Sequence, residues 1–469
     1  MALNTPGADF LAQIDKALPG VLHPVSAPYL EEPRGLVTGQ GAAVLKPRTT
    51  SEVATILTRA QEARVGVIPY AGGTGLVGGQ ISPEGPPALI LSLERMNGIT
   101  ALDRDGRTLL AGAGAILADI QAAAAAADLL FPLSLASEGS CRIGGNLATN
   151  AGGVNVIRYG NARDQCLGIE AVLADGTVID DLKPLRKDNS GYDLRNLLIG
   201  SEGTLGIITA ARLKLVDRPR EQITALLDIG APAQAVALLR HLQGAFAETL
   251  SAFELIDRTG IDFLAETMPE LSHPPTGSGR WLALVEIGAG PGAGLTARFE
   301  NALADAMETG LVQDGHLAQS EAQRSAIWAL RENLPEANRR IGAIASHDIS
   351  LPIAAIPEFI TTCHRRILDF APDLRVHAFG HLGDGNLHYN IFPPRGRAKS
   401  DYLNSRSAMT ETVHDLTADY GGSFSAEHGV GRQKREDLKK YGDPGLLAAM
   451  RQIKKALDPS GILNPGAIF

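Results

Sequence analysis

The sequence predicts an α+β protein in two parts, the second of which contains an antiparallel sheet. Three observations lead to this prediction. Apolar runs of strand length alternate with helical windows along the chain. The 52 glycines are clustered in a few loops, and the pattern changes character after Pro219. We therefore expect parts at 1–217 and 218–424, with a C-terminal segment, 425–469, that returns to the first part.

Composition excludes several classes of protein. The chain has 469 residues, 44% hydrophobic and 20% charged, which is ordinary for a soluble globular protein of two or three domains. Asp and Glu number 52 against 43 Lys and Arg, so no basic surplus is present to bind nucleic acid. No run reaches the roughly 18 apolar residues that a transmembrane segment needs. The N-terminus lacks a signal-peptide pattern and the 3 cysteines are far apart, so we expect a cytoplasmic protein.

In the first part, residues 51–64 are expected to form a helix capped by Thr50 or Ser51. Strands are predicted at 65–71 and 88–95, and 108–128 reads as strand, turn and helix. Further along, 167–181 is predicted to form two strands around Asp175-Gly176, a strong hairpin signal, followed by a helix at 193–199 and a strand at 203–215.

In the second part, strands and helices alternate from 222 to 310. A helix is predicted at 320–334, where Pro335 ends it. Two further helices are expected near 403–419 and 444–457.

The first glycine loop, Gly73–Gly78, matches the dinucleotide pattern G-x-G-x-x-G and follows a predicted strand. That pattern requires a helix directly afterwards, and Pro83, Pro86 and Pro87 prevent one. A dinucleotide-binding Rossmann unit is therefore excluded. Successive backbone N–H groups can still form an anion-binding nest, and an ordinary glycine turn is the alternative.

A second glycine-dense loop covers 137–153, where small polar side chains lie between the glycines. A short helix beginning near Gly144 would point its N–H groups at an anion. The small polar side chains suit the polar edge of a flavin ring. A third run, Ser201–Gly206, adds to this pattern, and three such loops are difficult to explain as turns alone.

Four motifs together, PYAGGTGLVGG, SCRIGGNLATNAGG, GYDLRNLLIGSEGTLGIIT and ILNPG, resemble the vanillyl-alcohol-oxidase/p-cresol-methylhydroxylase class of FAD proteins. They look most like its D-lactate and D-2-hydroxyglutarate dehydrogenase branch, over about residues 40–469. The resemblance implies a two-part FAD-binding domain of the vanillyl-alcohol-oxidase type and an α+β substrate (cap) domain. In this class a His or Cys sometimes bonds to the flavin. Because Thr74 occupies the matching stretch, we expect non-covalent FAD.

The resemblance also implies which residues contact FAD, with the pyrophosphate in the first loop and the isoalloxazine over the second. The expected cofactor-binding residues are Pro69, Ala71, Gly72, Gly73, Thr74, Gly75, Leu76, Gly78, Pro132, Leu133, Gly139, Ser140, Cys141, Gly144, Gly145, Asn146, Thr149, Asn150, Gly152, Gly153, Tyr159, Gly160, Glu202, Gly203, Gly206, Ile207, Ile208 and Asn464.

The segment HAFGHLGDGNLHYN predicts a β-hairpin. Asp384-Gly385 favours a two-residue type I′ turn, which would place His381 opposite His388 with Cβ atoms roughly 5 Å apart. Asn390 would point to the same side. Two close imidazoles can bind a metal, although a pair of purely structural histidines is the alternative.

Glu427-His428, in SAEHGVGR, could add a third ligand if the glycines that follow form a turn. The resemblance implies that His381, His388 and Glu427 bind a divalent metal, with Zn²⁺ favoured. It also implies that His428 is the base, that Asn390 contacts the substrate, and that hydride passes from the substrate Cα to flavin N5.

Arg331 matches a carboxylate-binding arginine of the branch, whereas a solvated arginine paired with Glu332 or Glu336 is the alternative. The chain departs from the 2-hydroxyglutarate members in two places. Ser346 stands where they usually have lysine, and Pro335 stands where they tend to have a hydroxyl residue. Losing a charged hydrogen bond costs about 1.5–3 kcal/mol, or roughly ten- to a hundredfold in affinity. D-lactate is therefore favoured over D-2-hydroxyglutarate.

Other functions stay open. The protein could be an oxygen-using D-lactate oxidase, a metal hydrolase or a non-catalytic flavin subunit. A related ether-lipid synthase branch has histidines where Ala426-Glu427 stand here. The electron acceptor could be a quinone, a cytochrome, an electron-transferring flavoprotein or oxygen, and a homodimer is possible.

Overall fold

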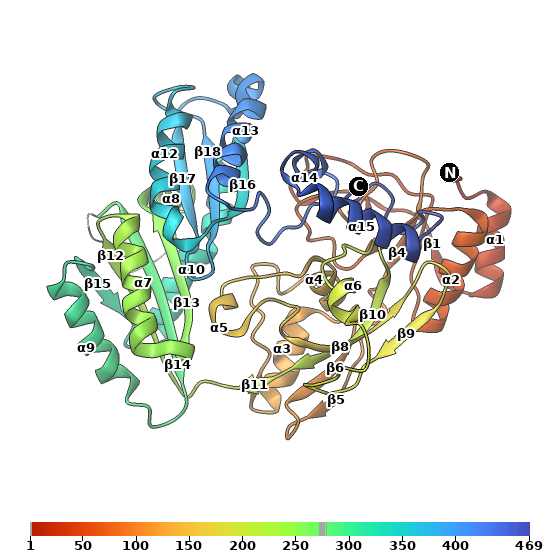
Figure 1. Ribbon diagram of the computed structural model, residues 1–469, viewed down its shortest axis with the longest axis horizontal. Coiled ribbons are helices and arrows are strands. Elements are labelled where there is room, and N and C mark those ends of the chain that lie inside the picture. Colours follow the sequence, from red (N-terminus) through yellow and green to blue (C-terminus); the bar gives the residue numbers. More distant parts are fainter. Residues whose placement is uncertain (1, 272–276, 278) are drawn as a thin grey trace. The chain divides into compact units, whose positions relative to one another are not determined.

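The computed structural model describes residues 2–271, 277 and 279–469, and the chain forms two compact units (Figure 1). The first contains Met1–Gly152, Gly160–Asp217 and Glu427–Phe469. The second contains Gly153–Tyr159 and Arg218–Ala426. The predicted α+β class is confirmed, because helices accompany both antiparallel and parallel strands. The functional division at 217 and 424 stays a prediction.

The first unit begins with a four-stranded sheet of order β1-β2-β4-β3, in which β2, β4 and β3 are parallel. Its elements are α1 (Ala8–Ala17), β1 (Leu22–His23), η1 (Ala27–Tyr29), β2 (Ala43–Leu45), α2 (Thr50–Ala63), β3 (Val67–Tyr70) and β4 (Leu89–Ser92). The cap of α2 is Thr49, whose hydroxyl accepts from the Glu52 N–H, and not Thr50 or Ser51 as expected.

A five-stranded antiparallel sheet of order β5-β6-β10-β8-β9 follows, with a small β7-β11 ladder beside it. The predicted hairpin is β8 paired with β9, joined through Asp175-Gly176. The elements are β5 (Ile99–Asp103), β6 (Thr108–Gly112), α3 (Leu117–Ala126), β7 (Leu129–Leu130), α4 (Ile143–Thr149), β8 (Cys166–Val172), β9 (Val178–Asp181), α6 (Leu194–Leu198), β10 (Ile207–Lys214) and β11 (Val216–Asp217).

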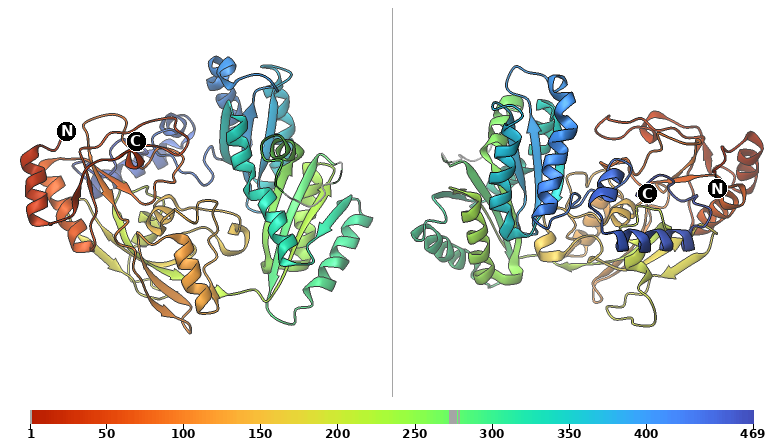
Figure 2. Two further views of the ribbon diagram at one scale, coloured as in Figure 1. Left: turned by 180° about the vertical axis from the view of Figure 1, so that it is seen from behind. Right: turned by 45° about the horizontal axis from the view of Figure 1, so that its top comes forward.

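The C-terminal segment completes this first unit. It forms α14 (Arg435–Tyr441) and α15 (Pro444–Leu457), and a tail that runs along β3. The Val67 N–H donates to the Ile462 carbonyl, and the Asn464 N–H donates to the Val67 carbonyl. Figure 2 shows the blue C-terminal end among the red and orange N-terminal elements of the same unit.

The second unit is built on one seven-stranded antiparallel sheet of order β15-β12-β14-β13-β17-β18-β16. Its strands are β12 (Glu221–Ile229), β13 (Leu250–Asp257), β14 (Trp281–Ala289), β15 (Asp314–Leu317), β16 (Ala345–Ser350), β17 (Arg375–His381) and β18 (Asn386–Phe392). Its helices are α5 (Val156–Tyr159), α7 (Pro232–Phe246), η2 (Ala247–Thr249), α8 (Arg258–Thr267), α9 (Leu295–Glu308), α10 (Glu321–Glu332), α11 (Leu334–Ile341), η3 (Ile353–Ala355), α12 (Ile356–Leu368), η4 (Lys399–Tyr402) and α13 (Leu403–Asp419).

Both faces of this sheet are covered by helices. One apolar cluster joins the sheet to α7, α9, α12 and α13, and a second joins the opposite face to α8, α10 and α11. Because the two faces are buried, a charged side chain on a central strand needs a partner within the protein. Within the part of the chain described, none of the helices combines the length and hydropathy needed to cross a membrane.

Candidate active site

A cavity in the first unit lies between the glycine-rich loops, with an empty volume of about 810 Å³ including the solvent at its mouth. Most expected cofactor residues of the first and third loops line it. The expected residues on its wall are Pro69, Ala71, Gly73, Thr74, Gly75, Gly144, Gly145, Asn146, Thr149, Glu202, Gly203, Gly206, Ile207, Ile208 and Asn464, together with the expected base His428. Sequence reasoning missed Val77, Gly79, Gln80, Leu93 and Ala148. The only signal in the sequence for Gln80 is that it is a polar residue close to the first glycine loop.

The other expected cofactor residues are not on the wall of this cavity: Gly72, Leu76, Gly78, Pro132, Leu133, Gly139, Ser140, Cys141, Asn150, Gly152, Gly153, Tyr159 and Gly160. Gly153 and Tyr159 belong to the second unit, where Arg158 donates to Ser251 and to the Gly288 carbonyl. Cys141 is buried, and burial raises the pKa of its thiol.

The two glycine loops press against each other. A Cβ on Gly72 would lie 2.7 Å from the Ser140 carbonyl oxygen, and one on Gly145 would lie 2.8 Å from the Ala71 carbonyl oxygen. Gly72 also has a φ of +95°, which disfavours other residues. Some of the glycine clustering therefore reflects loop packing and not ligand contact.

The cavity wall nevertheless suits FAD. Among the residues described, the N–H groups of Gly73, Thr74 and Gly75 donate to no other protein group, so they can form the anion nest that a pyrophosphate needs. Asn146 Oδ1 is buried on the wall and likewise accepts no hydrogen bond from the described chain. A buried acceptor of this kind is suited to a hydrogen-bond donor on a ligand.

The expectation that α4 points its N-terminus at an anion is wrong. The Ile143 and Gly144 N–H groups donate to the Ala115 and Ala113 carbonyls, and those of Gly145 and Asn146 donate to the Arg142 carbonyl. These bonds occupy the N–H groups of the first turn, whereas the N–H groups of the first loop are the ones suited to an anion.

A buried clamp holds the loop that carries His428. The Glu202 carboxylate accepts from the Val430 N–H and the Gly431 N–H, each at 2.7 Å. Burial raises the pKa of Glu202 despite these bonds. Arg432 donates to the Gly78 and Gly79 carbonyls and to Asn464 Oδ1, so it ties this loop to the first glycine loop. The sequence did not predict a role for Arg432. The available signal was its position directly after the glycine turn of the His428 loop.

The histidine hairpin forms, but its register differs from the prediction. His388 lies opposite Phe379, not His381, because the connection spans four residues, 382–385, and not two. Leu382 is buried in the core, and the Gly383 N–H donates to the Phe253 carbonyl, so both leave the ladder. A shift of two residues keeps every side chain on its face. His381 and His388 therefore still lie together, with ring centroids 5.6 Å apart.

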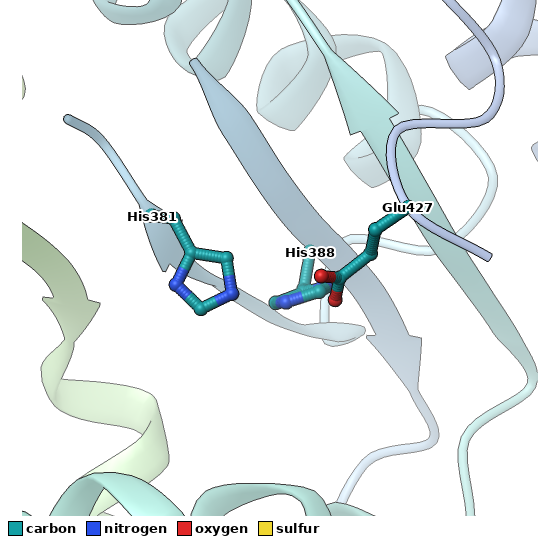
Figure 3. Close-up of side chains that lie close together, drawn as sticks. All are labelled: His381, His388 and Glu427. Carbon is teal, nitrogen blue, oxygen red and sulfur yellow. The ribbon is translucent and has the colours of Figure 1, made fainter. Parts of the chain in front are cut away.

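Glu427 lies with these two histidines. It directly follows Ala426, whose N–H bonds to the Asp348 carbonyl on β16. His381, His388 and Glu427 each offer one ligand atom, and these atoms lie within 4.8 Å of one another (Figure 3). Asp348, Glu427 and His428 form a second such group. Two imidazoles and a carboxylate are the ligands of an open Zn²⁺ site.

Arg331 is buried at the end of α10 and pairs with Glu254 of β13, not with Glu332 or Glu336. Its Nε donates to Glu254 Oε2 at 2.6 Å, while His381 Nδ1 lies 2.6 Å from Glu254 Oε1. Burial alone would raise the pKa of Glu254, but the charges of Arg331 and His381 and their hydrogen bonds lower it to about 2.

Two of the remaining predicted positions, Asn390 and Ser346, lie on the sheet face that carries His388. Asn390 lies opposite Ser346 and His377, and His388 lies opposite Asp348. Asn390 is buried, whereas Ser346 is exposed. Pro335 is in the first turn of α11 and exposed.

Comparison with known proteins assigns the family. Residues 41–181 match an FAD-binding domain, and residues 218–468 match the C-terminal domain of FAD-linked oxidases. The bovine protein named D-2-hydroxyglutarate dehydrogenase, mitochondrial, is 38% identical over 97% of this chain and 82% of its own. The chain belongs to the FAD-dependent D-2-hydroxyacid dehydrogenases.

Other members of this family agree. A D-2-hydroxyglutarate dehydrogenase of Xanthomonas citri is 37% identical over 91% of this chain and 89% of its own. A putative D-lactate dehydrogenase of Schizosaccharomyces pombe is 32% identical over 91% of this chain and 81% of its own. The fold matches p-cresol methylhydroxylase with a TM-score of 0.76 at 16% identity, covering 98% of this chain and 96% of that one. The vanillyl-alcohol-oxidase/p-cresol-methylhydroxylase fold is thereby confirmed.

The prediction of a cytoplasmic location is wrong. Family members from cattle, Arabidopsis thaliana and rat carry mitochondrial names, which points away from the cytoplasm. The prediction depended on unpaired cysteines and on the N-terminal pattern, and neither distinguishes the cytosol from another reducing compartment.

Proposed function

We propose that this dehydrogenase oxidises a D-2-hydroxy acid to the 2-oxo acid with FAD and a divalent metal, Zn²⁺ being favoured. The observation that carries the metal proposal is that ligand atoms of His381, His388 and Glu427 lie within 4.8 Å of one another. When bound, FAD supplies the two-electron acceptor and the metal lowers the pKa of the substrate hydroxyl.

The side chains of the chain supply binding and proton transfer. Arg331 presents a planar fork that binds the substrate carboxylate, and Asn390 orients the substrate from β18. His428, on the wall of the FAD cavity, accepts the hydroxyl proton at a ring nitrogen. The loss of that proton and of a hydride from Cα gives the 2-oxo acid.

A monocarboxylate such as D-lactate is our proposed substrate. Ser346 lies exposed on the face of the sheet that carries His388 and Asn390, and it offers no cation for a second carboxylate. The second candidate is D-2-hydroxyglutarate, which the names of the bovine and Xanthomonas relatives favour.

The test is anaerobic bleaching of the purified flavoprotein by D- and L-2-hydroxy acids, before and after removal of metal by a chelator. D-lactate should bleach the visible flavin band, and added Zn²⁺ should restore bleaching to the chelated protein. Turnover that survives complete demetallation would overturn the metal role. Oxygen consumption would separate an oxidase from a dehydrogenase.

A further inference from the structure

Glu254 lies where two parts of the proposed site meet. It is on β13, a strand buried along its whole length, and its side chain is 0% exposed. Its two carboxylate oxygens are divided between two partners, with Oε1 on His381 and Oε2 on Arg331, both at 2.6 Å. One carboxylate therefore contacts a proposed metal ligand and the proposed substrate-binding arginine.

The contact with His381 selects the nitrogen that can bind metal. Because Nδ1 lies against Glu254, Nε2 is the ring nitrogen that would act as the ligand. Figure 3 shows one ring nitrogen of His381 turned towards His388 and Glu427 and the other turned away. A carboxylate behind a ligating histidine fixes its ring orientation and tautomer.

The contact of Glu254 with Arg331 fixes the orientation of the guanidinium group. Glu254 binds the Nε edge of the guanidinium, and the guanidinium carbon lies 4.9 Å from the centroid of the Phe379 ring. Among the residues described, neither Nη atom of Arg331 makes a hydrogen bond to the protein. Glu254 thus holds the Nε edge of Arg331, and the Nη donors of the guanidinium can bind a ligand.

We propose that Glu254 is a positioning residue shared by the metal ligand His381 and the carboxylate-binding Arg331, so that one buried side chain sets both metal affinity and substrate affinity. This inference rests on the proposed function. An uncharged amide at the same position can accept from only one of the two partners while presenting an N–H donor to the other.

The chain offers a matched control. Glu286, on the neighbouring strand β14, is also buried and also pairs with an arginine of α10, Arg324. The described contacts of Glu286 include Thr224 and Trp328 but no histidine. Glu286→Gln therefore perturbs another ion pair between a buried glutamate and an arginine of α10 without touching the proposed metal site.

The experiment measures Zn²⁺ affinity of the FAD-loaded protein by competition with a chromophoric chelator. Glu254→Gln should weaken Zn²⁺ binding roughly 10- to 100-fold and raise KM for the 2-hydroxy acid, whereas Glu286→Gln should change neither by more than about threefold. Glu254→Asp, which keeps the charge, should fall between Glu254→Gln and the wild type. It serves as the test if the amide variant does not fold.

The outcomes separate the two proposals. A wild-type protein that binds no Zn²⁺ contradicts the proposed metal site itself. A wild-type protein that binds Zn²⁺, with Glu254 variants that bind it equally well, leaves the metal site intact and overturns the role of Glu254. Equal losses in Glu254→Gln and Glu286→Gln would also overturn it, because the effect would then be general destabilisation.

Discussion

Helix α10 carries two arginines two turns apart, and each reaches a buried glutamate on one face of the sheet. Arg324 binds Glu286 through both Nε and Nη2, and Thr224 and Trp328 bind the same carboxylate. Arg331 binds Glu254 through Nε alone, and the second oxygen of Glu254 faces His381.

The two ion pairs therefore differ in the donors they leave available. In the Arg324–Glu286 pair the protein itself uses the hydrogen-bonding groups, whereas in the Arg331–Glu254 pair the Nη donors of the arginine stay available. An ion pair of this second kind is suited to bind a ligand, and the saturated one is suited to hold the helix on the sheet.

The largest expected effect separates the two arginines. Arg331→Lys keeps the positive charge but removes the planar fork, so kcat/KM for the 2-hydroxy acid should fall roughly 100-fold, near the upper end of what a charged hydrogen bond contributes. Arg324→Lys should change kcat/KM by less than about threefold. Steady-state kinetics on both variants checks this. Equal losses would show that the two pairs do not differ in function.

Glu286→Gln should have the next largest effect, on stability and not on activity. It removes the buried charged partner of Arg324, whose other charged partner is the exposed Glu321, so the free energy of unfolding should fall by about 2 kcal/mol. Denaturant unfolding followed by circular dichroism measures this change. A stability equal to that of the wild type would contradict the structural role given to this pair.

The smallest expected effect concerns substrate choice. Ser346→Lys places a cation on the sheet face that carries Asn390, so Arg331 would no longer be the sole predicted partner for a dicarboxylate. We expect the ratio of kcat/KM for D-2-hydroxyglutarate to that for D-lactate to rise roughly tenfold, from one added charged hydrogen bond. Ser346→Gln serves as the uncharged control. An unchanged ratio in Ser346→Lys would argue against the monocarboxylate proposal.

Much of the fold could be predicted from the sequence, because the signals are local. Helix 51–64, the strands around it and the Asp175-Gly176 hairpin follow from periodicity, turn residues and caps, and they appear within a few residues of the predicted bounds. The histidine hairpin was misjudged by two residues because Leu382 is taken into the core, and a turn preference cannot report that. The even shift explains why the two histidines were still placed on one face.

The partner of Arg331 could not be predicted, because 77 residues separate it from Glu254. The sequence does contain a weaker signal that Glu254 needs a partner. Glu254 stands inside the apolar run SAFELID, and a glutamate in a strand buried on both faces must be paired. The sequence suggested only residues close to Arg331 along the chain, but Glu332 is exposed and Glu336 binds Arg339 and Arg340 on the next helix.

The tail that runs along β3 has a consequence for biosynthesis. β3 is the last strand of its sheet, and residues 462–464 cover its outer edge. On the ribosome, that edge is made early and is covered only after more than 380 further residues, the whole second unit included, have been synthesised. An uncovered strand edge is prone to pair with other chains. A nascent or truncated chain that lacks these last residues is therefore a natural client for molecular chaperones.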